Sequence, residues 1–200
     1  IDYVIQDRYS NALQAKTQQK LSPYHNNLVT NLQNHIQIIR GLPGLFAVNP
    51  ELTQEQFEVA MSHLIGEHTQ LRNIAAAPDM VIRYMYPVAG NEQAIGLDYR
   101  QEPTQAAAAE RARGSRNLVL AGPLELKQGG TGLITRIPVY LLDDQQQEYF
   151  WGIISAVIDV DAFFEASGLN AADLPIEMAI RGKDGLGEQG EVFFGEEALF

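Results

Sequence analysis

The chain has 200 residues, 46% of them hydrophobic, which is ordinary for a globular chain and enough for one large domain or two small ones. The net charge is −11, and residues 159–200 hold ten acidic and only two basic side chains. This excess of acid argues against a nucleic-acid partner, whose phosphates it would repel. Cysteine is absent, which permits any compartment, and no apolar run approaches the roughly 18 residues of a membrane span. The start at Ile1 resembles neither an initiator nor a signal peptide, so we expect an excised or processed fragment.

Residues 1–46 are predicted to be helical because apolar side chains recur three or four positions apart. Ser22-Pro23 interrupts the pattern, so it fits either one long kinked helix or two in series. Over 28–46 the spacing alternates four and three at Leu28, Leu32, His35, Ile39, Leu42 and Phe46. Such a stripe is typical of a dimerising stalk or of a helix packed on its own domain, and its short length favours the second.

The remainder reads as an α+β domain with mostly antiparallel sheets. A helix begins after Thr53, with Gln56 at the capping-box position and a buried stripe of Phe57, Met61, Leu64 and His68. Strands are expected over 74–77, 80–86, 117–121, 132–142, 148–160, 175–181 and 191–194. Pro138 indicates an edge or a bulge. Short helices are expected at 106–113 and 162–167, capped by Thr104 and Asp161.

No catalytic constellation stands out. The chain lacks a phosphate-binding loop, a nucleophile elbow and a His-Glu-x-x-His pair, so we expect no enzyme and no cofactor. No metal site is expected either, because Asp143-Asp144 fits a hairpin loop and Asp161 fits a helix cap.

Aromatic side chains in or beside the expected strands suggest a small-molecule pocket, with core packing as the alternative: Tyr84, Tyr86, Tyr99, Tyr140, Phe150 and Trp151. Asp98 follows a buried segment, where it could accept hydrogen bonds from a ligand, cap a turn, or pair with Arg100 or Arg83. Arg136 could bind an anion in the pocket or form a salt bridge at its rim.

A family resemblance rests on the order of several motifs across residues 50–170. They are Gly90-Asn91-Glu92, Ile95-Gly96-Leu97-Asp98-Tyr99, Leu120-Ala121-Gly122-Pro123, Gly129-Gly130, Arg136-Ile137-Pro138-Val139, and Trp151-Gly152 before Ser155. In this order they resemble the CHASE domain, an extracytoplasmic sensor of bacterial histidine kinases, cyclic-dinucleotide enzymes and plant cytokinin receptors.

The resemblance implies a stalk helix at 1–46, a membrane-distal PAS-like ligand-binding subdomain at 47–168, and the start of a smaller membrane-proximal subdomain at 169–200. By the same resemblance, Asp98 would contact the ligand. The resemblance also implies site residues at Leu120, Gly130, Thr131, Trp151 and Ser155. Residue type adds Tyr84, Tyr86 and Arg136 to this predicted site. The residues around Asp98 differ from the cytokinin-receptor pattern, which leaves the ligand unnamed.

The leading hypothesis is therefore a periplasmic sensor domain of an inner-membrane receptor, with flanking transmembrane helices and a cytoplasmic output enzyme. It would bind a small molecule and form a homodimer through the N-terminal helix. The alternative is a non-sensing periplasmic interaction or adhesion module, and a soluble enzyme ranks third.

Overall fold

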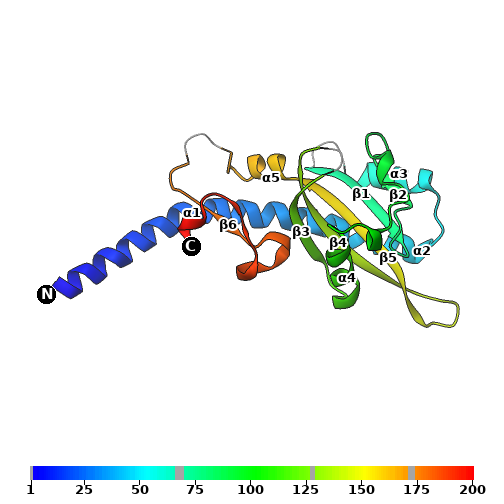
Figure 1. The fold of residues 1–200 in the computed structure, drawn as a ribbon, viewed down its shortest axis with the longest axis horizontal. Coiled ribbons are helices and arrows are strands. Elements are labelled where there is room, and N and C mark those ends of the chain that lie inside the picture. Colours follow the sequence, from blue (N-terminus) through cyan, green and yellow to red (C-terminus); the bar gives the residue numbers. More distant parts are fainter. Residues whose placement is uncertain (1, 66–69, 127–128, 171–173) are drawn as a thin grey trace.

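A single long helix leads into the domain. The computed structural model describes residues 2–65, 70–126, 129–170 and 174–200. Helix α1 runs from Asp2–Gly41 without a break at Pro23, and α2 follows at Pro43–Val48. The hydroxyl of Ser22, the residue before the proline, donates to the carbonyl of Gln18 (2.7 Å). The first part of α1 projects beyond the rest of the molecule (Figure 1).

Helix α3 (Gln54–Ile65) begins with the predicted capping box. The amide of Thr53 donates to the side chain of Gln56 (2.8 Å), and the amide of Gln56 donates to the hydroxyl of Thr53 (3.2 Å). The buried stripe is Phe57, Met61 and Ile65. Leu64 was predicted in that stripe, but it is exposed. The buried face follows the four-residue spacing from Phe57 to Met61 to Ile65, and Leu64 lies beside that row. His68 lies outside the described residues.

Five antiparallel strands form the main sheet, which confirms the α+β prediction (Figure 1). They are β1 (Leu71–Pro78), β2 (Tyr84–Tyr86), β3 (Val119–Glu125), β4 (Thr131–Leu142) and β5 (Glu148–Asp159), in the order β2-β1-β5-β4-β3. The strand predicted at 80–86 is shorter than expected, since Asp79 and Met80 take positive φ in a turn. Pro138 lies beyond the part of β4 that pairs with β3 and beside a register shift, as its residue type indicated.

The sheet has two covered faces, set by the alternation of side chains along each strand. Ile74 and Ala76 of β1 face the end of α1, α2 and α3. Ala75 and Ala77 face the other way, toward the 3-10 turns η1 (Glu92–Ala94) and η2 (Tyr99–Gln101) and helix α4 (Ala106–Ser115). The residue that precedes α4 as its N-cap is Gln105, one position after the predicted Thr104.

A smaller unit packs at one end of the sheet. Helix α5 (Val160–Ala166) is capped by Asp159 and not by Asp161, because the Asp159 carboxylate accepts from the amide of Ala162 (3.0 Å). The chain then forms β6 (Ile180–Arg181), the 3-10 turns η3 (Lys183–Gly185) and η4 (Gly187–Gln189), β7 (Val192–Phe194) and η5 (Glu197–Leu199). Turn η3 lies against β3. The predicted strand at 175–181 is thus reduced to its last two residues.

The stripe of α1 from Leu28 onward packs on its own domain. Ile39 and Phe46 are fully buried against the sheet, and Leu28 and Leu32 pack on α5 and the β6–β7 ribbon. His35 is 4% exposed, and its Nδ1 donates to the carbonyl of Asn31 (2.6 Å). The stripe is therefore used inside one chain, as its short length favoured.

Candidate ligand-binding site

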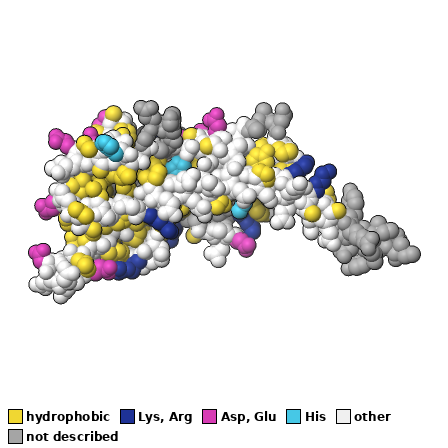
Figure 2. All heavy atoms as spheres, turned by 180° about the vertical axis from the view of Figure 1, so that it is seen from behind, with side chains coloured by type: hydrophobic (Ala, Val, Ile, Leu, Met, Phe, Trp, Pro, Cys, Tyr) yellow, Lys and Arg dark blue, Asp and Glu magenta, His cyan; other side chains and the backbone are white. Residues whose placement is uncertain are grey.

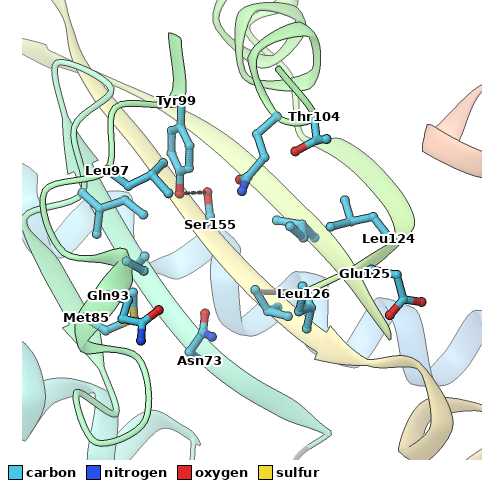
Figure 3. A pocket seen from close by; sticks show the side chains of 16 residues that line it. Asn73, Met85, Gln93, Leu97, Tyr99, Thr104, Leu124, Glu125, Leu126 and Ser155 are labelled. Carbon is cyan, nitrogen blue, oxygen red and sulfur yellow. Dashed lines mark hydrogen bonds between the residues drawn. The ribbon is translucent and has the colours of Figure 1, made fainter. Parts of the chain in front are cut away.

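A cavity of about 90 Å³ lies between the sheet and the segment that runs from η1 to α4. Strands β1, β3, β4 and β5 form its floor, and residues 93–105 form its roof (Figure 3). Most of its lining is apolar: Ala75, Ile82, Met85, Ala94, Leu97, Leu124, Leu126, Ile134 and Val157. The polar lining residues are Asn73, Gln93, Tyr99, Thr104, Gln105, Glu125 and Ser155. An apolar cavity with a few placed polar groups is the usual form of a small-molecule site.

The polar groups on the floor are held in place by hydrogen bonds. The hydroxyl of Tyr99 donates to Ser155 of β5 (3.0 Å), drawn as the dashed line in Figure 3. The amide of Asn73 donates to the side chain of Asn91 (2.9 Å). Burial raises the pKa of the Tyr99 phenol above its usual value, so this hydroxyl stays protonated and remains a donor. Glu125 lies at the edge of the set of lining side chains, away from Leu97 (Figure 3).

Arg136 of β4 does not itself line the cavity, but its side chain contacts two residues that do, Gln105 and Tyr99. It pairs with Ser155 across the β4–β5 ladder and lies two residues from Ile134, on the same face of the sheet. Its side chain is 0% exposed, its Nη2 donates to the Gln105 side-chain oxygen (2.7 Å), and its guanidinium carbon lies 5.3 Å from the centre of the Tyr99 ring. Loss of hydration lowers the pKa of Arg136 below its usual value.

Two nitrogens of Arg136, Nε and Nη1, are buried with no hydrogen-bond partner among the described residues. The described residues also place no carboxylate within ion-pair distance of it. The sequence left Arg136 open between a rim salt bridge and an anion-binding group, and its full burial removes the rim position.

Asp98 is engaged within the protein. Its carboxylate accepts from the backbone amide of Arg100 (2.9 Å) and, through both oxygens, from the Arg100 guanidinium (2.8 to 3.1 Å). The hydrogen bonds from Arg100 hold the pKa of Asp98 below its usual value. Asp98 therefore caps η2 and pairs with Arg100, as one sequence-based alternative stated, and it does not line the cavity.

The structure separates the other predicted site residues into three places. Tyr84 and Trp151 lie on the opposite face of the sheet, in the core around Phe46, and Tyr86 packs against that core. Leu120 lines a second, apolar cavity of about 160 Å³ beside α1 and α5. Thr131 donates to the Glu125 carboxylate at the cavity edge (3.0 Å), and Gly130 precedes it in the turn before β4. Of these predicted site residues, Ser155 lines the cavity, and Arg136 contacts the lining residues Gln105 and Tyr99.

Sequence reasoning did not select Asn73, Gln93 or Gln105. They are neutral polar residues without a motif, and each reaches the cavity only through the strand order and the path of the roof segment. The one available signal was periodicity: Asn73 is a polar residue at a buried position of β1, where an apolar residue would be expected.

Among the described residues no group of three His, Asp or Glu side chains is arranged to hold a metal ion. Outside the grey atoms, the face drawn in Figure 2 carries its Lys and Arg side chains in small separate groups. Within the described ranges no helix is long and apolar enough to span a bilayer.

The fold is an α+β domain on a long helix with a cavity beside its sheet, and comparison with known proteins identifies the family. The model of the CHASE domain matches residues 26–194. The chain therefore belongs to the CHASE domain family, whose members are extracytoplasmic sensor domains, and the resemblance read from the sequence is confirmed.

Two solved structures resemble this chain. One is titled "Extracellular ligand binding receptor from Desulfohalobium retbaense DSM5692", with a TM-score of 0.67 and 16% identity over 90% of this chain. This chain spans 31% of that receptor's length, and the likeness is one of fold. The other is the periplasmic domain of RsbU from Chlamydia trachomatis, with a TM-score of 0.42, 14% identity, and coverage of 82% of this chain and 60% of that one. No curated protein matches this sequence.

Proposed function

We propose that this domain senses a small molecule bound in the cavity between the sheet and the η1–α4 segment. The observation that carries the proposal is the cavity itself, a largely apolar space lined by Tyr99, Gln105 and Ser155, with the buried, incompletely bonded Arg136 in contact with Gln105. The output is a cytoplasmic histidine kinase or cyclic-dinucleotide enzyme, reached through flanking transmembrane helices of the full-length protein. The chain itself is the sensor and not the enzyme.

The cavity walls suggest how binding becomes a signal. Its floor is the sheet, and its roof is a separate segment held by turns, so a bound molecule would fix the distance between them. A ligand shifts a protein toward one state only when its affinity for the two states differs. Ile39 of α1 and Phe46 of α2 pack against the opposite face of the same sheet. A change in the curvature of the sheet would therefore displace the end of α1 and α2 directly.

The test is to fill the cavity without disturbing the core. Ala94 lines the cavity and is partly exposed, so Ala94→Phe places a ring in the ligand volume. We expect one or more members of a metabolite panel to raise the melting temperature of the wild-type domain, and Ala94→Phe to lose that rise.

The matched control is Ile95→Phe, at the next position, which is 43% exposed and does not line the cavity. It should keep the response. Asp98→Ala in the same assay tests the residue that the family resemblance selected. A panel that leaves the wild-type melting temperature unchanged would favour the non-sensing interaction module.

A homodimer through the first part of α1 belongs to the same proposal. Leu13 and Leu21 are large apolar side chains of α1 that are 55% and 42% exposed, and Leu21 also lies beside Ile180 and Phe200. The first part of α1 projects beyond the rest of the molecule (Figure 1). We expect the domain to dimerise with rising concentration in sedimentation equilibrium, and Leu13→Lys with Leu21→Lys to shift it to monomer. Val59→Lys, an exposed apolar site on α3, should leave the dimer intact. A dimer that survives the double change would contradict this interface.

A further inference from the structure

We infer that the cavity takes a small organic monocarboxylate and that Arg136 is the residue that recognises its charge. This inference rests on the proposed function and names the ligand class of the same site. The starting observation is the burial of a charged group with few hydrogen-bond partners. A guanidinium that is 0% exposed has given up its hydration, and it recovers one neutral hydrogen bond, from Nη2 to Gln105. Burial of a charged group is strongly unfavourable unless a group of opposite charge is placed next to it.

The protein does not supply that partner within the described residues. Tyr99 offers its ring at 5.3 Å, a cation–π contact worth less than an ion pair. The Asp184 carboxylate favours the charged form of Arg136 from a distance, but it is bonded to the amide of Gly122 (2.7 Å). The positive charge of Arg111 disfavours the charged form of Arg136 and lowers its pKa. The guanidinium therefore keeps an unbalanced positive charge next to the lining residues Gln105 and Tyr99.

The amino end of α4 reinforces this positive region. Gln105 is the N-cap residue, so the first turn of the ten-residue helix begins beside the guanidinium. First-turn amides lack partners within a helix and carry partial positive charge, which favours an anion at that end. The amide of Ala106 already donates to the carbonyl of Glu102 (2.8 Å), so the helix contributes here through its dipole. Gln105 is both the N-cap of α4 and the hydrogen-bond partner of Arg136, and both features favour a negatively charged ligand.

The cavity composition decides between classes of anion. One buried cation matches one negative charge, and the described lining adds no second Lys or Arg. Glu125 at the edge and the net charge of −11 disfavour multiply charged ions such as phosphate. The lining is otherwise mainly aliphatic, and about 90 Å³ suits a molecule of few atoms. A carboxylate can also accept two hydrogen bonds from one guanidinium, and a short apolar tail fits the rest.

Gln105 then has a specific part. Its side-chain oxygen occupies one donor of Arg136 at 2.7 Å, as a neutral stand-in for a carboxylate oxygen. A bound carboxylate would compete with it or join it, and movement of Gln105 would be felt directly at the start of α4. Gln105 is thus a positioning residue for the proposed ligand.

The first experiment uses Gln105→Glu, which keeps the shape of the side chain and installs a permanent carboxylate next to Arg136. We expect a higher melting temperature with no ligand added, and loss of any response to propanoate because the counter-charge is already present. Gln93→Glu, which lines the same cavity without contacting Arg136, should not raise the melting temperature. A Gln105→Glu domain that melts at or below the wild-type temperature would overturn the inference.

The second experiment compares propanoate with propanamide, its neutral analogue of nearly equal shape, by thermal shift and calorimetry. Propanoate should stabilise the wild-type domain and propanamide should not. Arg136→Met should retain the fold and bind propanoate roughly ten- to a hundredfold more weakly, the loss expected for charged hydrogen bonds. Inorganic phosphate and sulfate form a separate arm, and stabilisation by these ions alone would contradict the carboxylate assignment.

The outcomes separate this inference from the proposed function. If only neutral compounds stabilise the domain and Ala94→Phe abolishes their effect, the cavity is a sensing site and the anion assignment is wrong. If Gln105→Glu stabilises the domain and no compound of any class does so, Arg136 needs a counter-charge and the sensing proposal fails. Equal binding of propanoate by Arg136→Met and the wild-type domain would overturn the role of Arg136.

Discussion

Phe46→Ala is expected to lower the free energy of unfolding by about 3–5 kcal/mol, the range for removing a buried aromatic side chain. Phe46 of α2 is 0% exposed, and its ring centre lies 4.2 Å from that of Trp151, 5.5 Å from that of Tyr84 and 6.1 Å from that of Phe57. The four rings join α2, α3, β2 and β5. The change therefore leaves a cavity where the helices meet the sheet, and the surrounding rings cannot collapse into it without moving the helices.

Urea denaturation measures this loss, and the chain offers a local probe. Trp151 is the only tryptophan, so its fluorescence reports on the packing around Phe46, while circular dichroism reports on the whole fold. Val48→Ala is the matched control in the same helix, since Val48 is 88% exposed and its truncation should change stability by less than about 0.5 kcal/mol. A similar small change in Phe46→Ala would mean that α2 is not anchored to the sheet.

Gly152→Ala should be the most damaging small substitution in β5, with a loss of about 3 kcal/mol or failure to fold. A Cβ at position 152 would overlap the carbonyl oxygen of Ala77 and come within 2.7 Å of the Pro78 Cα. Both obstacles are backbone atoms of β1, the neighbouring strand, so no rotation of a side chain relieves the contact. The pairing of β1 with β5 would have to shift, and both covered faces of the sheet depend on that pairing.

Gly114→Ala provides the control with the opposite sign. Gly114 lies inside α4, and a Cβ there meets nothing within 4 Å. Alanine in a helix interior is more stable than glycine by roughly 0.5–1 kcal/mol, so this variant should melt slightly above the wild-type domain. Thermal melts of both variants compare the two glycines directly. A Gly152→Ala domain as stable as Gly114→Ala would show that β1 can move away from β5.

Local patterns predicted the elements whose signals are local. The capping box at Thr53 and the strands β4 and β5 follow from a few neighbouring residues, and they were found near their true bounds. The turn at Asp79 and Met80 was missed because positive φ at residues other than glycine is imposed by the surrounding structure. The same holds for the cap of α5, where Asp159 and Asp161 are both suitable and only the path of β5 selects the first.

The candidate site was less predictable than the fold. The contact between Gln105 and Arg136 joins residues far apart in sequence, and no spacing rule connects them. The aromatic residues were correctly placed in or beside strands, but a one-residue alternation decides which face each reaches, and Tyr84 and Trp151 reach the helical side. The assignment of Asp98 as a ligand-binding residue stays a prediction. Its hydrogen bonds to Arg100 give it a structural role that the family resemblance does not imply. The division at residues 47–168 and 169–200 also stays a prediction.

The unequal burial of α1 makes this helix a lever. Its later part is fixed to the sheet and to α5, while residues 11–20 are exposed along their whole length. At 1.5 Å per residue the helix is roughly 28 Å long from Asp2 to Lys20, so a tilt of about 5° at the fixed end moves the tip by about 2.5 Å. A translation along the helix axis is not amplified by the length of the helix, because a rigid helix moves by the same distance at both ends. Tilting is thus the motion that this geometry magnifies. Pro23 lies near the point where the helix leaves the domain, so the bending stiffness of the helix at Pro23 would set how much of the tilt reaches its amino end.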